Sequence, residues 1–483
     1  MNIKPLSSIY QKTHILFRRI YFRIISSLGR IDCDKPYITN KKLFQLLNNK
    51  INTEEDLYRD FKLNYKWIIK VGEILGGENE KGNIVRQRKL IIERANNICD
   101  HQIQILGFGQ LNLGSEIPWH SDCTTGYEFE KNKNYFEIKP ASYPGGYEIK
   151  IPWELSRFNH FIRLGQAFVL TKNEKYAKEF VNQAKHWVND NPPYYGVNWL
   201  NTMEVSIRVI NWLISLSMFR HSKHVSQDLI ILLNKQFYLH GLFIYHNLEN
   251  LKKQRNNHYI SNLTSLITLG IFCPQFVEAQ KWLSFGIKSL WQELDRQVLE
   301  DGCSYEGSTT YHSFVLEMVL WVLILLRSEN NSIPESINYK VIKMVQFVQD
   351  ITYPDGVMPL IGDYDGGRFF KFHVIESGNE GNKNYSHVLA IGSVLYPDKD
   401  FGNKVRCQWD DAFWLFGEEA FQKFNKITKE KNYRESSRNT AISKTYSQGG
   451  YHISQSIEGN TKYNVRMATK DGPGSHRHND VCS

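Results

Sequence analysis

The sequence has no apolar run long enough to cross a membrane, few cysteines and little proline. Its longest uncharged apolar run, Met318 to Leu326, is far shorter than the roughly 20 residues that a bilayer requires. The seven cysteines stand singly, without a Cys-x-x-Cys pair, which argues against a thiolate metal site or a disulfide framework. With 14 prolines and 32 glycines in 483 residues, the chain is neither collagenous nor of low complexity.

Apolar and aromatic residues are plentiful instead. The chain is 41% hydrophobic, 23% charged and 13% aromatic, which predicts a globular protein with a large core. The formal net charge is +9, and residues 1–30 hold six lysines and arginines without an acid. Arginines interrupt the apolar residues there, so a cleavable signal peptide is not indicated. This segment is either a basic first helix of the globule or an interfacial amphipathic helix.

The chain divides into four regions that differ in composition and in hydrophobic periodicity. We expect a helical N-terminal region at 1–95 and helix after helix at 151–352. Between them, at 96–150, we expect the strand-like QIQILGFGQLNL and then an irregular connection rich in glycine, proline and aromatics. At 353–483 we expect short strands, a helix near 385–395 and a hairpin in GYHISQSIEGNTKYNVRMAT.

Apolar residues recur at helical spacing over about 202–220, 226–247, 258–272, 275–300, 309–328 and 336–351. Short connections between such helices predict antiparallel hairpins, and without a visible residue-level repeat a closed toroid is favoured over a solenoid.

Four short segments carry polar residues that a helical core would not need. They are RNNHY at 255–259, DGCSYEGSTTYH at 301–312, PDGVMPLIGDYDGGRFF at 354–370 and DGPGSHRHND at 471–480. Each also has a purely structural interpretation, because asparagine, serine and threonine cap helices and aspartate forms turns. The His-x-His spacing in the last segment suits a metal or paired catalytic roles.

Together these residues suggest a reaction. Asparagine and histidine can neutralise a carboxylate, and tyrosine or a second histidine can move a proton. Acidifying the carbon beside a carboxylate and expelling the group at the next carbon is β-elimination, which in a polysaccharide requires a uronic acid. The alternative is glycoside hydrolysis by paired carboxylates such as Glu306 with Asp363 or Asp365.

The motifs resemble a known family in their order along the chain. They are IPWELSRFNHFIRLGQAFVLT, NPPYYGVNWLNTMEVSIRVINW, RNNHYI, DGCSYEGSTTYHSF, PLIGDYDGGR and GSHRHND. From about Ile117 to the last residue, the chain resembles the heparinase II/III-type and alginate-lyase-like polysaccharide lyases, especially members found with bacterial surface-polysaccharide genes. The resemblance implies a mainly α fold: an (α/α) toroid, then an antiparallel β-sheet (β-sandwich) domain, with a cleft between them.

The resemblance also assigns roles to individual residues. Asn257 matches the asparagine that neutralises the substrate carboxylate, and His258 beside it is the base or its helper. Tyr311 matches the tyrosine that protonates the leaving oxygen and, in a syn elimination, also removes the proton. His476 matches the first histidine of the His-x-His pair, with a catalytic or charge-neutralising role. His478 matches the second, which in relatives helps to hold a structural divalent ion.

We place four further residues at the substrate. Arg157, Arg208 and Arg255 are candidate contacts for a carboxylate or sulfate, because the guanidinium is a rigid fork of donors. Glu306 is placed with them. An equally open alternative for Arg208 is an ion pair with Glu204 one helical turn away.

One departure from the family concerns the C-terminal part. Family members continue well beyond the His-x-His run, so we expect a truncated member whose β domain is incomplete and whose activity is open. The chemistry requires no cofactor, and the structural divalent ion belongs to a complete chain. The expected partner is an acidic polysaccharide and not nucleic acid. The other class left open is a non-catalytic glycan-binding protein. The family resemblance implies a periplasmic protein, while the N-terminus leaves a cytoplasmic one open.

Overall fold

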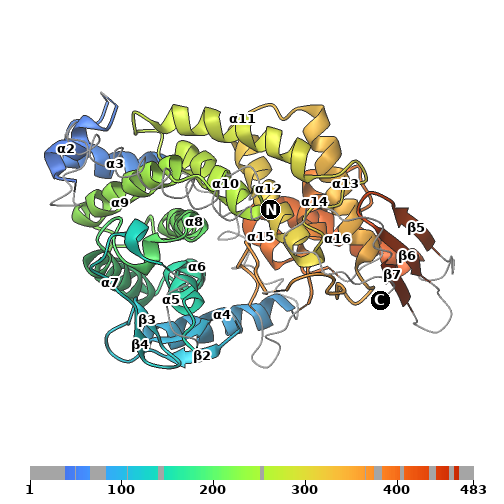
Figure 1. The fold of residues 1–483 in the computed structure, drawn as a ribbon, viewed down its shortest axis with the longest axis horizontal. Coiled ribbons are helices and arrows are strands. Elements are labelled where there is room, and N and C mark those ends of the chain that lie inside the picture. The colour runs from blue at the N-terminus through green and yellow to red at the C-terminus, as the bar shows by residue number, and fades with distance from the viewer. Residues whose placement is uncertain are drawn as a thin grey trace, which may run out of the picture.

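A computed structural model gives the fold of the chain (Figure 1). The residues that it describes are 38–48, 50–65, 83–105, 107–139, 146–250, 255–364, 366–374, 383–402, 407–434, 442–455 and 462–466. Residues 1–37 of the expected N-terminal region, the His-x-His segment and the end of the chain lie outside these ranges.

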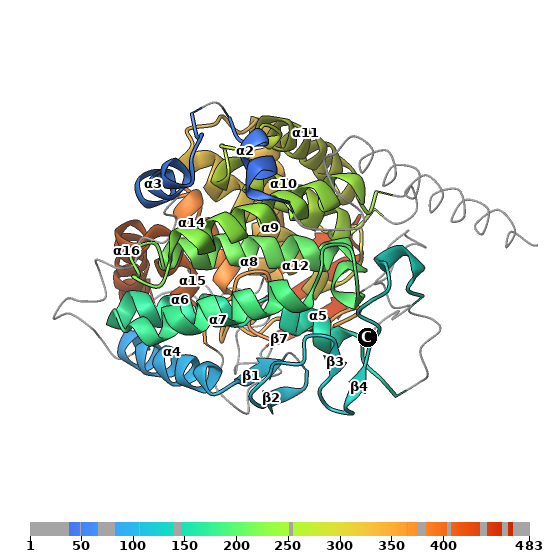
Figure 2. The ribbon, with the colours of Figure 1, turned by 90° about the vertical axis from the view of Figure 1, so that its left-hand side faces the viewer.

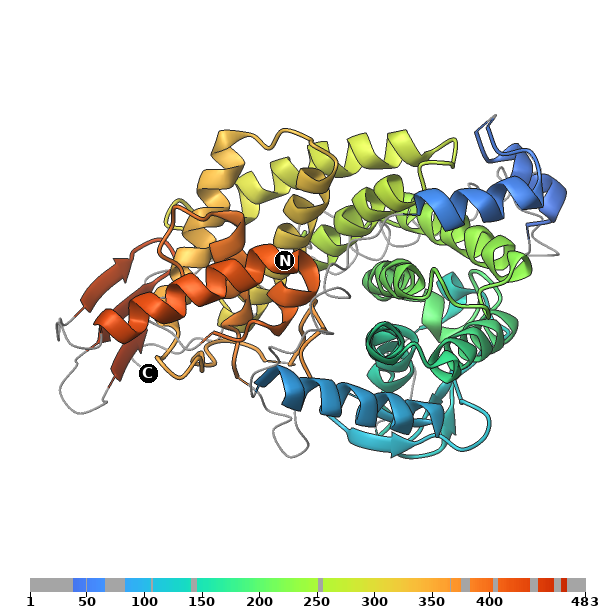
Figure 3. The same cartoon turned by 180° about the vertical axis from the view of Figure 1, so that it is seen from behind.

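Most of the helices follow one another around an incomplete ring, which Figures 1 and 3 show from opposite sides. They are α4 (Asn83–Cys99), α5 (Lys150–Ser156), α6 (Asn159–Thr171), α7 (Glu174–Asp190), α8 (Thr202–Met218), α9 (Gln227–His246), α10 (Asn257–Phe272), α11 (Ala279–Gln297), α12 (Thr309–Ser328), α13 (Glu335–Ile351) and α14 (His387–Leu395). Each helix predicted from periodicity is present, with its ends shifted by a few residues.

The ring has an inner row of helices, each with an outer partner. α4, α6, α8, α10, α12 and α14 contact one another in that order, and α7, α9, α11 and α13 pack as the hairpin partners of α6, α8, α10 and α12. Figure 2 shows α7, α8 and α9 lying one above another with similar axis directions. This arrangement confirms the predicted toroid of helix hairpins.

Composition explains which helices lie inside. α8, α10 and α12 are buried around nearly their whole circumference, whereas α7, α11 and α13 bury one face. In the described part of the chain, α12 alone is long and apolar enough to cross a membrane, but 94% of its apolar window is buried inside the fold. Its composition is that of a core helix.

The N-terminal part adds two short helices and two small hairpins. α2 (Asn40–Gln45) and α3 (Glu54–Asn64) pack on α9. In the region 96–150, β1 (Gln102–Ile105) pairs with β2 (Gly109–Asn112), and β3 (Ser121–Asp122) pairs with β4 (Tyr127–Glu128), both antiparallel. The β1–β2 hairpin lies against α4 and α5, so it forms part of the ring's edge.

Helices continue beyond residue 352, where the helical region was expected to end. α14, α15 (Asp410–Phe416) and α16 (Glu418–Arg434) pack on one another, and α14 packs on α12 and α13. Strands resume only with β5 (Ile442–Tyr446), β6 (Tyr451–Gln455) and β7 (Lys462–Arg466), an antiparallel sheet in the order β5-β6-β7.

The predicted hairpin at the C-terminal side is present as β6 and β7, and the sheet is held by α13. The rings of Tyr446 and Tyr451 each lie 5.0 Å from that of Phe347, and the Tyr446 hydroxyl donates to Asp350 at 2.6 Å. A lone hairpin is marginal in water, so these aromatic contacts with a helix are what stabilise it. The fold is mainly α, followed by the start of an antiparallel sheet.

Candidate functional site

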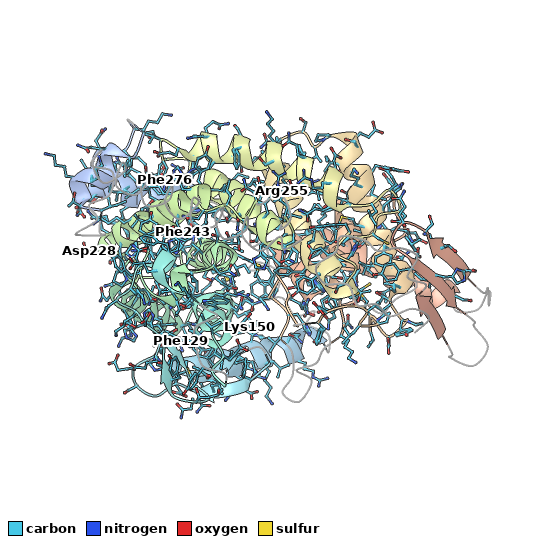
Figure 4. The ribbon with its side chains drawn as sticks, viewed as in Figure 1. Phe129, Lys150, Asp228, Phe243, Arg255 and Phe276 are labelled. Carbon is cyan, nitrogen blue, oxygen red and sulfur yellow. The ribbon has the colours of Figure 1, made fainter. Side chains whose placement is uncertain are left out.

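A pocket of about 390 Å³ with several polar side chains in its lining lies where three inner helices begin. Asn201, Met203 and Glu204 come from the start of α8, Asn257 and His258 from α10, and Thr310, Tyr311 and Phe314 from α12. The rest of the lining comes from the β1–β2 turn (Gly107, Phe108), from α5 and its flanks (Glu148, Lys150, Trp153, Glu154, Arg157) and from Tyr364 and Gly367. Figure 4 labels Lys150 on α5.

The hairpin architecture explains why these helix starts meet. Each outer helix returns the chain, so α8, α10 and α12 begin at the same end of the ring. Their N-caps are Asn201, Asn256 and Ser308, whose side chains accept hydrogen bonds from first-turn backbone N–H groups. Capping is therefore done by Asn256 and Ser308, which leaves Asn257 and Tyr311 for the pocket. Helix N-termini carry partial positive charge, so this end of the ring favours an anionic group.

Asn257 is held from behind by Glu306. Its backbone N–H donates to Glu306 Oε1 at 2.8 Å and its side-chain Nδ2 donates to Oε2 at 2.9 Å. Glu306 is fully buried and does not line the pocket, so it does not fit the expected substrate contact. It fixes the direction of the amide instead, and the second N–H of Nδ2 is left for another acceptor. Asn257 Oδ1 is buried without a hydrogen-bond partner among the described residues.

His258 is paired with Glu249. The Nδ1 atom of His258 lies 2.9 Å from Glu249 Oε1, and Glu249 Oε2 accepts from Asn262 Nδ2 at 3.2 Å. Burial disfavours the imidazolium, but the hydrogen bond and charge of Glu249, with Glu204 and Glu306 further off, raise the pKa of His258. The pair therefore favours a positively charged His258 beside Asn257.

Arg157 lies in the pocket wall between two carboxylates. Its Nε and Nη2 donate to the two oxygens of Glu204 at 2.5 and 2.7 Å, and its Nη1 donates to Glu154. The bidentate geometry fixes the guanidinium plane. Glu204 thus pairs with Arg157 and not with Arg208, as the helical spacing alone had allowed.

Aromatic side chains border the pocket. Tyr311 and Trp153 are half-buried in its lining, and the indole N–H of Trp153 donates to the carbonyl of Val197 at 2.9 Å. Phe108 and Tyr364 lie at the pocket with exposures of 37% and 38%. Amphipathic ring faces of this kind suit the apolar faces of sugar rings.

Two of the arginines expected at the substrate lie elsewhere. Arg208 is 0% exposed, stacks 4.5 Å above the ring of Trp187, and donates to His240 Nε2 and the carbonyl of Asn198. Burial lowers its pKa to about 9. Enclosed in this way, Arg208 cannot reach a ligand in the pocket, and its role is structural.

Arg255 precedes α10 but does not line the pocket (Figure 4). Its Nη1 donates to the buried Glu293 at 3.0 Å and its Nε donates to the carbonyl of Asn250 at 2.9 Å. These bonds fix the chain just before Asn257. Among the four arginine and glutamate residues expected to contact substrate, Arg157 is the one that lines the pocket together with Asn257, His258 and Tyr311.

Four further candidate residues remain: three lie outside the residues that the structure describes, and Asp363 lies in a loop. His476, His478 and Asp365 lie outside the described residues, so the roles expected for the His-x-His pair and the structural divalent ion stay predictions. The backbone carbonyl of Asp363 accepts from Ser308 and Thr310 at 2.8 Å, which ties its loop to the start of α12. Within the described ranges, no three histidines, cysteines or carboxylates are grouped as metal ligands.

Sequence reasoning did not single out the pocket residues Glu154, Lys150 and Trp153, nor Glu249 behind His258. It named Glu204 only as a candidate partner of Arg208. The signal for Glu154 was present, because it lies three residues before Arg157 on one helix face. Glu249 precedes RNNHY by only a few residues, but nothing in the spacing identifies its partner as His258.

Comparisons with known proteins agree with the fold and the motifs. Residues 59–371 match the family model described as "Heparinase II/III N-terminus". The heparin-sulfate lyase of Pedobacter heparinus is 25% identical over 379 residues, covering 73% of this chain and 52% of that protein. The heparin-sulfate lyase of Bacteroides thetaiotaomicron is 25% identical over 266 residues, covering 49% of this chain and 37% of that protein.

A solved structure gives the same result for the fold. The crystal structure of heparinase III matches with a TM-score of 0.60 at 16% identity, over 92% of this chain and 65% of that one. The chain spans about half the length, or less, of the curated relatives above.

Proposed function

The chain belongs to the heparinase II/III family, and from that premise we propose that it is a polysaccharide lyase. We propose that it cleaves a uronic-acid-containing acidic polysaccharide by β-elimination in the pocket at the starts of α8, α10 and α12. The observation that carries this proposal is the convergence of Asn257, His258, Tyr311 and Arg157 on one pocket, although they come from three separate segments of the chain.

Different residues of the pocket serve different steps of an elimination. The proton on the carbon beside the carboxylate must leave, the bond from the next carbon to the bridging oxygen must break, and that oxygen must take up a proton. Arg157 fixes the pocket wall, because its charge is already paired with Glu154 and Glu204. Asn257 donates its free N–H to the substrate carboxylate, and the helix N-termini and the charged form of His258 favour negative charge there. Stabilising the carboxylate in this way stabilises the enolate-like charge that develops when the proton leaves.

Proton transfer falls to Tyr311, with His476 as the second candidate. Tyr311 protonates the leaving oxygen and, in a syn elimination, also removes the proton. Glu249 raises the pKa of His258 and so favours its charged form, which suits charge neutralisation better than proton removal. The product is a shortened polysaccharide ending in an unsaturated uronate.

The test is the ultraviolet absorbance of the unsaturated uronate. Full-length protein is mixed with heparan-like, alginate-like and other uronic-acid polymers, and with a neutral glycan as the control. Absorbance growth with at least one acidic polymer and none with the neutral glycan is expected. Release of reducing ends without absorbance would overturn elimination in favour of hydrolysis. The buried, hydrogen-bonded Glu306 makes a poor hydrolytic acid.

A non-catalytic glycan-binding protein is the second outcome of the same experiment. Oligosaccharide binding without absorbance or reducing ends would support it.

A further inference from the structure

We infer that a second pocket, which adjoins the first at Glu154, is an anion-binding subsite. In it, Lys371 binds a carboxylate or sulfate of a neighbouring sugar. This inference rests on the proposed function, because it names the chemistry of the substrate beyond the reacting unit. The pocket is about 180 Å³, several times the space that a single water needs. Lys371, Arg94, Arg163 and Glu154 are the fixed charges in its lining.

The two pockets share more than Glu154. The first takes Trp153 and Arg157 from the α5–α6 segment, and the second takes Leu155 and Asn159 from the same segment. The strand β1 lines the second pocket and the turn that follows it lines the first. A chain of sugars that leaves the first pocket along this hairpin therefore meets the second.

The lining of the second pocket is positively charged. It holds two arginines and a lysine against the single carboxylate of Glu154, and that carboxylate is already bound by Arg157 and Asn159. His160 also lies there, and because burial lowers its pKa to about 4 it adds no charge at neutral pH.

Lys371 is the cation of this lining whose charged group has no direct bond among the described residues. Its side chain is half-buried, and no hydrogen bond or ion pair from its ammonium is present among the described residues. Arg163, in contrast, donates to the carbonyls of Lys371, Phe372 and His373 at 2.9, 3.1 and 3.2 Å. The carboxylates of Glu154 and Glu317 act on Lys371 only through their charge, so an incoming anion that bonds the ammonium directly offsets part of its desolvation.

The backbone that carries Lys371 is fixed independently of the ammonium. Glu317 Oε2 accepts from the N–H groups of Phe369 and Phe370, both at 2.7 Å, and Asp411 Oδ1 accepts from that of Phe372 at 2.9 Å. Arg368 Nη2 donates to Asp411 Oδ2 at 3.1 Å. These buried contacts hold residues 368–372 rigid, so the ammonium is presented at a set position and little order must be imposed when an anion binds.

The experiment is calorimetric titration with two hexasaccharides, one unsulfated and containing glucuronate, the other sulfated heparin. Tyr311→Phe is the background, so that turnover is slowed. Lys371→Gln removes the charge, Lys371→Arg keeps it, and Lys178→Gln is the matched control, an exposed lysine on α7. We expect Lys371→Gln to weaken binding on the order of tenfold or more, while the other two variants stay within about threefold.

The pattern of loss identifies the anion. Equal weakening for both hexasaccharides assigns the subsite to a carboxylate, and weakening for the sulfated one alone assigns it to a sulfate. Binding by Lys371→Gln within twofold of the parent for both hexasaccharides would overturn the inference, provided that the melting temperatures agree.

Failure of the proposed function has a different signature. If the hexasaccharides bind but no polymer yields the unsaturated product, the subsite stands and the lyase reaction does not. If no hexasaccharide binds, inorganic sulfate at constant ionic strength is the probe. A rise in melting temperature for the parent and Lys371→Arg that is absent in Lys371→Gln supports the anion site, and equal rises in all three overturn it.

Discussion

Asn257 binds Glu306 through both its backbone and its side chain, at 2.8 and 2.9 Å, so that one buried carboxylate fixes the first residue of α10. The two residues are far apart in the sequence and belong to two of the four motifs singled out at the start. This contact explains why both motifs begin a helix at the same pocket. It also makes Glu306 a positioning residue for the amide of Asn257.

The first prediction is that Glu306→Gln damages both stability and turnover. Glutamine offers one acceptor and one donor where the carboxylate offers two acceptors, so a donor then faces one N–H of Asn257. Losing a hydrogen bond to a buried charged acceptor should lower the free energy of unfolding by about 1.5–3 kcal/mol. Urea denaturation gives that value, and kcat for the elimination should fall more than KM rises.

The matched control is Glu335→Gln, an exposed glutamate in the first turn of α13. It should change the free energy of unfolding by less than about 1 kcal/mol and leave kcat unaltered. If Glu306→Gln also keeps kcat and stability, the carboxylate does not position Asn257.

The second prediction concerns the pKa of His258. Because Glu249 raises it, Glu249→Gln should move the pKa of His258 downward. Titration of the imidazole resonances by NMR measures the shift, and His258→Gln identifies the resonance by removing it. A His258 pKa that is the same in both proteins would show that Glu249 does not hold the charged form.

The same pair links stability to pH. Since the pKa of His258 is higher in the folded than in the unfolded chain, its contribution to stability is complete below the unfolded value of about 6.5. This contribution is lost as pH rises through the folded-state pKa. Comparing the melting temperatures of the parent and His258→Gln at pH 5.5 and pH 9 tests the sign, and the difference between them should be larger at pH 5.5.

The third prediction is a mutant cycle at Arg157 and Glu204. Arg157→Met leaves Glu204, whose side chain is 4% exposed, without its bidentate partner. Removing one partner from a buried ion pair should cost about 3–5 kcal/mol of the free energy of unfolding. Adding Glu204→Gln removes the uncompensated charge and should restore part of the loss.

Urea denaturation of the four proteins in the cycle gives the coupling energy. The control is Arg59→Ala, which breaks the ion pair with Asp56 on the surface of α3, where the arginine side chain is 63% exposed. That change should cost at most about 1 kcal/mol. Equal effects of Arg157→Met and Arg59→Ala would contradict the buried pair.

Periodicity predicted the ring, because α8, α10 and α12 are long, rich in apolar residues and begin at capping residues. It also predicted that Asn257, His258 and Tyr311 begin helices, which is why they share one end of the toroid. The strand-like segment at 102–113 is present as β1 and β2. The β3–β4 pair was not predicted, since so short a hairpin is decided by its packing against α5.

The partners of the charged residues could not be predicted. Arg208 has Glu204 one turn away, but Glu204 pairs with Arg157, which is 47 residues distant in sequence. Arg208 is instead enclosed by Trp187, Trp199 and His240, a surrounding that only the tertiary fold creates. Local spacing therefore identified Arg157 but not Lys150, Glu154 or Glu249, nor the pairs that the charged residues form.

The last prediction is that Tyr311→Phe removes turnover and keeps the fold. The hydroxyl is the group that protonates the leaving oxygen, and a lost general acid typically lowers the rate on the order of 10²–10⁴-fold. The ring stays in the pocket lining, so substrate affinity should change little. Steady-state kinetics on the best polymer and binding of a non-cleaved oligosaccharide measure the two quantities separately.

If Tyr311 has only a structural role, Tyr311→Phe should lower stability and leave turnover nearly unchanged. Loss of one hydrogen bond would lower the free energy of unfolding by roughly 1 kcal/mol while kcat stayed near the parent value. Tyr364→Phe is the matched control, because its ring also borders the pocket but belongs to the loop before α14. A kcat for Tyr311→Phe within about threefold of the parent means that no transition-state interaction was lost. Proton transfer would then fall to His258 and His476.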